Sequence, residues 1–314
     1  MAAPYRSYIQ PEADAEFPAE AGRYHLYITY SCPFACRALS ARNLKGLQNV
    51  IGLSVAHPIY QKTRPGDETD THKGWVFVDP TTEPTVTGPD GKEYSTEGCI
   101  PDTVTNSRFA RDIYERVSKE PRAFSVPILW DKKKQTIVSN ESADILRTLN
   151  TGFRDLVPSE VDLLPPALEK EIDEVNAGLV QDIASSMFKV VLAKEEETRT
   201  AELAKYFEHI QRANDVLAKS RFLVGNSITE ADVRLFHTLI RFDVSQRPGD
   251  NLNLTQYPNL VNYLRELYQN PALKATVNWA HLKLMLLNFN PEAVGYDPSV
   301  DYDAPHDRAT RFAN

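Results

Sequence analysis

The chain has few cysteines, no long apolar run and no excess of basic residues. Three cysteines, Cys32, Cys36 and Cys99, match no zinc-ligand spacing, so we expect no bound metal. No segment approaches the ~18 apolar residues that a transmembrane helix needs, so we expect no membrane partner. A formal net charge of −8 argues against nucleic acid, whose phosphates are neutralised by a concentrated basic face.

The remaining composition is that of a globular protein. Hydrophobic residues make up 42% and charged residues 25% of the 314 residues, which is enough for two domains. Residues 1–23 have neither the apolar core of a signal peptide nor the Arg-rich bias of a transit peptide, and we interpret them as an extended arm. Because cysteines are few, we expect a reducing compartment, the cytoplasm.

Cys32 lies between a predicted strand, Tyr24–Tyr30, and a predicted helix, Pro33–Leu44. Pro33 suits the first helical position. The free N–H groups and the dipole at a helix start favour a thiolate and lower the pKa of a thiol. Cys32 is therefore the candidate nucleophile, and a small buried residue is the alternative. Cys36 is too far along the helix for a Cys-x-x-Cys pair, and we interpret it as a buried side chain rather than a resolving thiol.

Residues 24–155 have the element order of a thioredoxin-like α/β domain. A second strand is predicted at Ile51–Ala56, and a long irregular insertion follows at residues 57–105. The domain is completed by a helix, two strands and a closing helix, predicted at Ser107–Val117, Val126–Asp131, Thr136–Ser139 and from Asn140 onward.

Two further signals lie near the end of this domain. Pro127, at the start of a strand, is a candidate cis proline that leaves the backbone of Val126 free to bind a ligand. Glu141 and Ser142, at a helix start, offer a carboxylate, a hydroxyl and free N–H groups to an amino-acid-like ligand. The alternative is a plain helix cap, supplied by Asn140 or Ser142.

Residues 156–290 show only helical periodicity, and residues 291–314 form a C-terminal extension. Thr229 and Asp232 form a predicted capping box at the start of a buried helix. This helix is predicted at Glu230–Arg241, and further helices are predicted at Leu163–Leu179, Glu195–Ala218 and Leu260–Gln269. An α/β thioredoxin-like domain followed by an all-α domain of this kind is the glutathione transferase fold.

Several motifs together resemble the Xi class of glutathione transferases, the glutathionyl-hydroquinone reductases, over nearly the whole chain. The matching stretches are residues 22–27, 32–35, 74–77, 126–131, 137–142, 187–189, 229–236, 239–243, 257–260, 276–278 and 281–283.

The resemblance implies that the chain is a cysteine-type, glutathione-dependent enzyme that acts on an aromatic small molecule and forms a homodimer. The Cys32 thiolate would remove glutathione from a glutathionyl-hydroquinone through a mixed disulfide, and a second glutathione would regenerate it. By the same resemblance, the glutathione contacts are Phe34, Trp75, Arg111, Val126, Pro127, Glu141 and Ser142.

The chain departs from the family where the resemblance places tyrosines near the aromatic substrate. Phe188 and Met285 stand in that neighbourhood, and residues 244–250 lack tyrosine. We therefore expect a more apolar second-substrate pocket and slow turnover of simple glutathionyl-hydroquinones, because a positioned acid contributes ~10²–10⁴-fold in rate. Two alternatives stay open: a transferase that conjugates glutathione or processes a specialised metabolite, and a non-catalytic protein that binds glutathione or an aromatic ligand.

Overall fold

The computed structural model describes residues 3–120, 122–247 and 249–313, and the chain divides into two units. The N-terminal unit holds the described residues up to Glu160 together with Thr276–Val294. The C-terminal unit holds Val161–Ala275 and the described residues from Gly295 onward. The first two residues of the predicted arm, and Pro248 in the segment 244–250, lie outside the described residues.

A four-stranded sheet with the order β2-β1-β7-β8 forms the centre of the N-terminal unit. β1 pairs in parallel with β2, and it pairs antiparallel with β7 on its other side. The strands are β1 (Tyr24–Ile28), β2 (Ile51–Val55), β7 (Ile128–Asp131) and β8 (Thr136–Ser139). Every residue of β1 and β7 is buried, as the β-branched and aromatic composition of both strands predicts.

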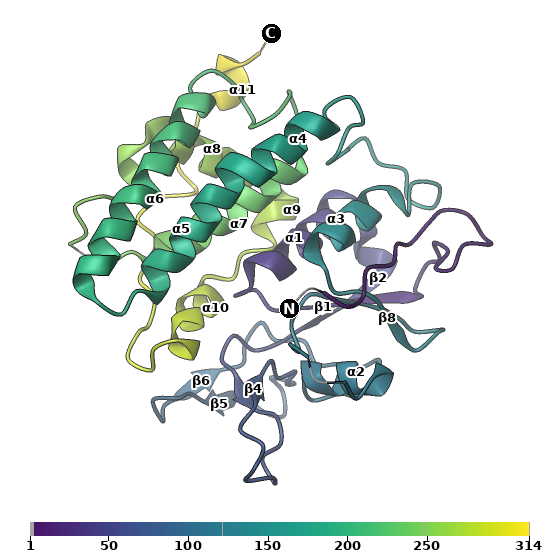
Figure 1. The fold of residues 1–314 in the computed structure, drawn as a ribbon. Helices are drawn as coiled ribbons and strands as arrows, with labels where there is room; N and C mark the ends of the chain where they lie inside the picture. The colour runs from purple at the N-terminus through teal and green to yellow at the C-terminus, as the bar shows by residue number, and fades with distance from the viewer. Residues whose placement is uncertain (1–2, 121, 248, 314) are drawn as a thin grey trace. The chain divides into compact units, whose positions relative to one another are not determined.

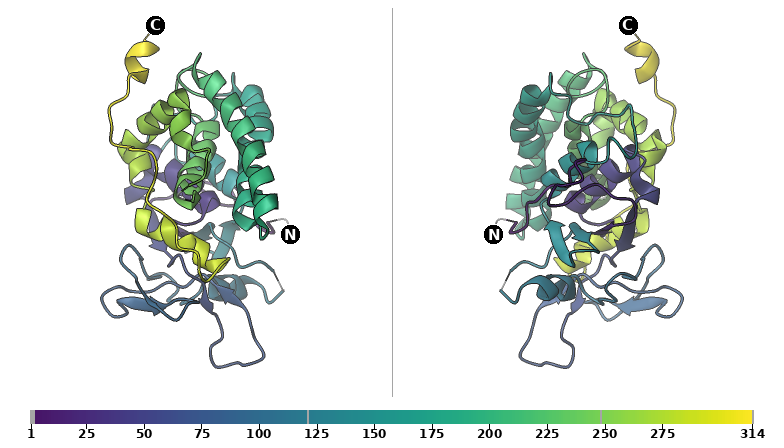
Figure 2. Two further views of the ribbon diagram at one scale, coloured as in Figure 1. Left: turned by 90° about the vertical axis from the view of Figure 1, so that its left-hand side faces the viewer. Right: turned by 90° about the vertical axis from the view of Figure 1, so that its right-hand side faces the viewer.

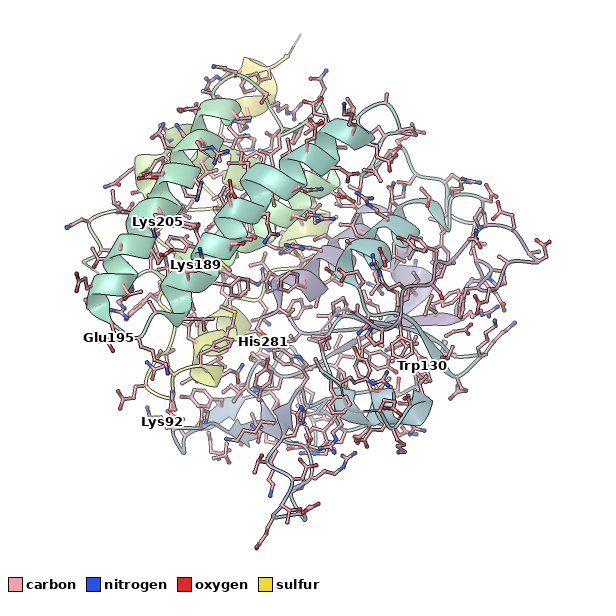
Figure 3. The ribbon with its side chains drawn as sticks, viewed as in Figure 1. Lys92, Trp130, Lys189, Glu195, Lys205 and His281 are labelled. Atoms are coloured by element: carbon pink, nitrogen blue, oxygen red, sulfur yellow. The ribbon has the colours of Figure 1, made fainter. Side chains whose placement is uncertain are left out.

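Helices cover both faces of this sheet (Figure 1). α1 (Pro33–Leu44) and α3 (Ser142–Thr151) pack against each other on one face, and α2 (Ala110–Val117) lies on the other. Trp130 of β7 is fully buried in the sheet (Figure 3). The thioredoxin-like architecture predicted from the sequence is confirmed, and α1 has the predicted bounds.

The arm is fixed to the edge strand β8 and to α3. Arg6 forms an antiparallel bridge with Ser139, and the Ser7 N–H donates to Val138 O at 3.0 Å. The Arg6 guanidinium donates to both oxygens of Asp144, at 2.6 and 2.9 Å. The Tyr8 hydroxyl donates to the same carboxylate at 2.8 Å. These contacts lower the pKa of Asp144 against the opposing effect of its burial, so the carboxylate stays charged.

The insertion at residues 57–105 is more regular than the sequence indicated. It contains two small antiparallel sheets, β3–β4 and β5–β6 (Figure 2). The strands are β3 (Gln61–Lys62), β4 (Lys73–Gly74), β5 (Thr85–Thr87) and β6 (Glu93–Ser95). Strands of two or three residues are too short to show the alternation from which a strand is predicted.

The N-terminal unit also contains the short 3-10 helix η1 (Leu47–Asn49) and the segment Thr276–Val294 from the C-terminal part of the sequence. This segment contains α10 (Trp279–Leu284) and η4 (Met285–Asn288). The Asn288 side chain is hydrogen-bonded to both Pro58 and Tyr60 in the insertion.

The C-terminal unit consists of helices, as predicted. α7 is its central helix and is buried along almost its entire length. The elements are α4 (Glu169–Val175), η2 (Asn176–Val180), α5 (Gln181–Leu192), α6 (Glu196–Leu217), α7 (Glu230–Ser245), η3 (Leu254–Gln256), α8 (Pro258–Gln269), α9 (Pro271–Lys274) and α11 (Arg308–Arg311). The helix predicted to begin at Leu163 begins only at Glu169, because Pro165 and Pro166 precede it.

The predicted capping box at the start of α7 is confirmed. The Thr229 N–H donates to Asp232 Oδ2 at 2.8 Å, and the Leu223 N–H donates to Oδ1 at 2.9 Å. The Tyr263 hydroxyl also donates to Oδ1 at 2.8 Å. Within the described ranges, no helix is both long enough and apolar enough to cross a membrane.

Candidate functional site

Cys32 is the N-cap of α1, where the sequence predicted it. Pro33 occupies the first turn, and the Ala35 N–H donates to the Cys32 sulfur over 3.5 Å. The same sulfur lies 3.7 Å from the backbone oxygen of Val126. These two backbone groups fix the position of the sulfur. The side chain is half-buried, so it is still accessible to a small ligand.

Cys36 and Cys99 lie in different surroundings. Cys36 is buried, and its sulfur lies 3.5 Å from Tyr30 O and 3.7 Å from Thr29 O. Burial raises the pKa of the Cys99 thiol to about 12. All three cysteines are free thiols, and the surroundings of Cys36 fit a small buried side chain.

The Val126–Pro127 peptide bond is cis, as predicted. It precedes β7 and lies beside a cavity of about 390 Å³ in the N-terminal unit. Five of the predicted glutathione contacts line this cavity: Phe34, Val126, Pro127, Glu141 and Ser142. The other lining residues are Ala3, Pro4, Arg122, Ala123, Ser125 and Asn140.

Glu141 is itself the N-cap of α3, which the sequence assigned to a neighbour. Its Oε1 accepts from the Ala143 N–H at 3.2 Å and from the Ser142 hydroxyl at 3.3 Å. One carboxylate oxygen thus caps the helix while the side chain lines the cavity. The capping and ligand-binding interpretations are therefore compatible.

Arg122 brings a positive charge to the cavity that the sequence did not reveal. Its guanidinium donates to Glu120 O at 3.0 Å, to the Tyr5 hydroxyl at 2.8 Å and to Ser118 Oγ at 2.7 Å. The contact with Tyr5 links the guanidinium to the arm. A single arginine in a loop forms no sequence motif. Only its position in the wall of the cavity identifies Arg122 as a candidate contact for a ligand.

Trp75 and Arg111 are not among the residues that line this cavity. Trp75 is almost fully buried, and its ring packs edge-on against Tyr60 with a centroid distance of 4.4 Å. Arg111 pairs with Asp70 at 2.5 Å and with Glu115 at 2.6 Å. Both residues belong to the unit that contains Cys32, but these contacts place them in the packing of the insertion and α2.

The predicted second-substrate residues belong to different units. Phe188 is on α5 of the C-terminal unit, and Met285 begins η4 of the N-terminal unit. Their assignment to an aromatic pocket stays a prediction.

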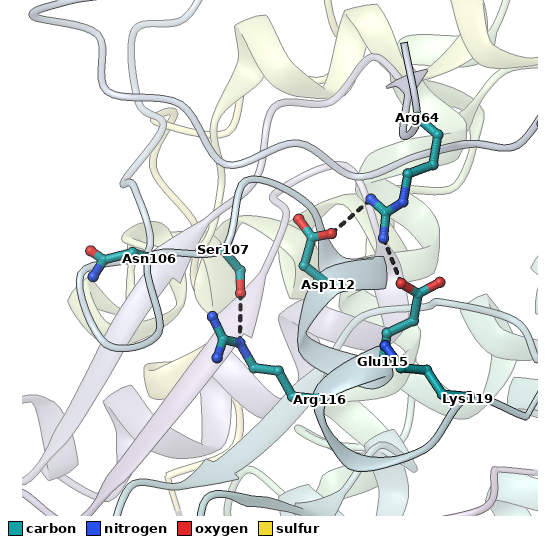
Figure 4. Close-up of a pocket in the computed structure, with 7 residues that line it drawn as sticks. All are labelled: Arg64, Asn106, Ser107, Asp112, Glu115, Arg116 and Lys119. Atoms are coloured by element: carbon teal, nitrogen blue, oxygen red, sulfur yellow. Dashed lines mark hydrogen bonds and ion pairs between the residues drawn. The ribbon is translucent and has the colours of Figure 1, made fainter. Parts of the chain in front are cut away.

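A second hollow, of about 370 Å³, lies along α2 (Figure 4). Ion pairs dominate its wall: Arg64 contacts Asp112 at 2.8 Å and Glu115 at 2.5 Å. None of the predicted site residues lines it. Within the described residues, no cluster of three or more His, Cys, Asp or Glu side chains could hold a metal ion.

Comparisons with known proteins agree with this geometry. Residues 31–151 match the family described as glutathione S-transferase, N-terminal domain, and residues 196–266 match glutathione S-transferase, C-terminal domain. The chain is 36% identical over 311 residues to glutathionyl-hydroquinone reductase YqjG of Escherichia coli, covering 96% of this chain and 87% of that protein.

Solved structures are similar over nearly the whole chain. The glutathione-bound structure of YqjG has a TM-score of 0.82 and 34% identity, and the match covers 98% of this chain and 97% of that one. The glutathione S-transferase Xi of Phanerochaete chrysosporium has a TM-score of 0.81 and 33% identity, and the match covers 98% and 99% of the two chains.

Proposed function

The chain belongs to the Xi class of glutathione transferases, the glutathionyl-hydroquinone reductases, and from this premise we propose that it removes glutathione from glutathionylated aromatic compounds. The observation that carries the proposal is the position of Cys32, at the start of α1 and beside the cis Val126–Pro127 bond. Relatives named as reductases of glutathionyl-hydroquinones and a glutathione-bound relative support the same substrate class.

The charges around the cavity fit the γ-glutamyl end of glutathione, which carries an ammonium and a carboxylate. We assign the ammonium to the Glu141 carboxylate. The carboxylate is assigned to the Ser142 hydroxyl and the first N–H groups of α3, where the helix dipole favours an anion. The free backbone of Val126 is assigned to the peptide part of the ligand, which would be paired as in strand addition.

The reaction follows from thiol chemistry at Cys32. Its thiolate attacks the glutathione sulfur, a Cys32–glutathione disulfide forms, and the bond from that sulfur to the aromatic carbon breaks. The electron pair leaves with the aromatic carbon, which takes up a proton. A second glutathione attacks the mixed disulfide, leaves as glutathione disulfide and restores Cys32. No second enzyme thiol is needed, which agrees with the burial of Cys36.

Turnover of glutathionyl-menadione in the presence of glutathione tests the proposal. The wild type should release menadione, which has lost its glutathionyl group, and glutathione disulfide in equal amounts. Cys32→Ser should abolish this turnover and still bind glutathione. A fully active Cys32→Ser variant would remove the proposed mechanism.

We further infer a homodimer and a cytoplasmic location. The membership in this class supports the dimer, and the three free thiols fit a reducing compartment. Light scattering of the purified chain would test the first inference, and imaging of the tagged protein in its own cell would test the second.

A further inference from the structure

Tyr60 lies at the same edge of the sheet as Cys32. β1 and β2 run in parallel with Ile28 opposite Val55, so the segments that follow both strands leave the sheet at one edge. The Ala56 N–H donates to Ile28 O at 2.8 Å and holds the two segments together. β7 runs antiparallel and begins at this edge, where Val126 meets the Cys32 sulfur.

The Tyr60 ring is held firmly in this position. Its backbone N–H donates to Asn288 Oδ1 at 2.8 Å, and the Asn288 amide donates to Pro58 O at 2.7 Å. The ring packs against Trp75 with an interplanar angle of 68°. The hydroxyl itself is not used: within the described residues, no protein group is hydrogen-bonded to the Tyr60 phenol oxygen.

The surroundings keep this phenol neutral. Burial raises the pKa of Tyr60 to about 12, and the charge of the Cys32 thiolate acts in the same direction. A neutral phenol is a proton donor near neutral pH, and its conjugate base is strong enough to take a proton from a thiol.

We propose that Tyr60 is the catalytic acid that protonates the departing aromatic carbon. This assignment rests on the proposed function and adds the source of the proton. As the Cys32 sulfur bonds to the glutathione sulfur, the bond from that sulfur to carbon breaks and its electron pair goes to the ring carbon. That carbon takes the Tyr60 hydroxyl proton and leaves a phenolate. The thiol of the second glutathione returns a proton to the phenolate, and its thiolate opens the Cys32 disulfide.

The assignment changes one expectation from the sequence. The expected loss of phenols rested on positions such as Phe188, whereas Tyr60 lies in the insertion. A chain with Tyr60 in this role reduces glutathionyl-hydroquinones without those phenols.

A Tyr60→Phe variant tests the role, because it keeps the ring that packs on Trp75 and loses only the hydroxyl. Two substrates are compared: glutathionyl-menadione, whose leaving atom is carbon, and the mixed disulfide of glutathione with 2-mercaptoethanol, whose leaving sulfur needs little protonation. We expect kcat to fall about 10²–10⁴-fold on the first substrate and to stay unchanged on the second. Tyr94→Phe is the matched control, since Tyr94 lies on β6 and its hydroxyl donates to Asp90 at 2.8 Å.

The outcomes separate the assignment from the proposed function. An equal fall in kcat on both substrates would mean that Tyr60 supports the Cys32 thiolate or the fold, and it would overturn the assignment. Undiminished turnover of glutathionyl-menadione by Tyr60→Phe would also overturn it and would leave the proposed function intact. If the wild type reduced the mixed disulfide but not glutathionyl-menadione, both the assignment of Tyr60 and the proposed function would be wrong.

Discussion

The dual position of Glu141 gives a prediction that a pair of variants can resolve. One carboxylate oxygen caps α3 through the Ala143 N–H at 3.2 Å, and the proposed function assigns its charge to the ammonium of glutathione. Glu141→Gln keeps an oxygen acceptor for the cap and removes the charge, whereas Glu141→Ala removes both.

The two substitutions test two different quantities, the affinity for glutathione and the free energy of unfolding. Loss of a charged hydrogen bond to the ligand costs about 1.5–3 kcal/mol, which corresponds to a rise in the glutathione Kd of roughly 10- to 150-fold. Loss of an N-cap costs about 0.5–2 kcal/mol of stability. We therefore expect both variants to bind glutathione weakly and only the Ala variant to lose stability.

Calorimetric titration with glutathione and urea unfolding measure the two effects separately. A glutathione analogue without the α-amino group serves as the matched ligand: it should bind weakly to the wild type and lose little further affinity in Glu141→Gln. Unchanged affinity for glutathione in Glu141→Gln would refute the ligand role and leave Glu141 as a helix cap.

Three further predictions concern the thiols, the arm and the buried His57. Iodoacetamide should label half-buried Cys32 first, and Cys36→Ser should leave turnover nearly unchanged; loss of turnover in Cys36→Ser would mean that the second thiol takes part in the cycle. Asp144→Asn should loosen the arm, whose Ala3 and Pro4 line the cavity, and raise the KM for glutathione several-fold with little change in kcat; an unchanged KM would show that the arm wall does not affect binding. Burial lowers the pKa of His57 to about 4. As pH falls, His57 is therefore protonated in the unfolded chain at a higher pH than in the folded chain. The free energy of unfolding should decrease between about pH 6.5 and 4, by about 3 kcal/mol for this group. Urea unfolding across this pH range should show a smaller loss for His57→Asn, and an identical loss would assign the effect to other groups.

The sequence predicted the elements whose patterns are long and local. α1 and β8 have the predicted bounds, and Cys32 is the predicted cap, because strand periodicity, helical periodicity and the Cys-Pro pair all indicate the same boundary. The cis bond before Pro127 was also predicted correctly. These features depend on neighbours in sequence.

Features that depend on contacts between distant segments could not be predicted in this way. The interactions of Arg111 with Asp70 and Glu115 depend on the folding of the insertion, whose strands are too short to leave a pattern. Arg122 and Tyr60 carry no motif, and their positions follow from the arm and from Asn288. The wall of the cavity was therefore predicted only in part.

The arm and the insertion also protect the sheet from other chains. An exposed edge strand offers unpaired N–H and C=O groups on which a second molecule can add a strand. At β8, the arm occupies this position through Ser7 and Val138. At β2, Val55 and Ile100 exchange two backbone hydrogen bonds, of 2.9 and 3.0 Å. The arm thus pairs with β8 and the insertion pairs with the last residue of β2, so a protein shortened by its arm should assemble through β8 into aggregates whose growth depends on concentration.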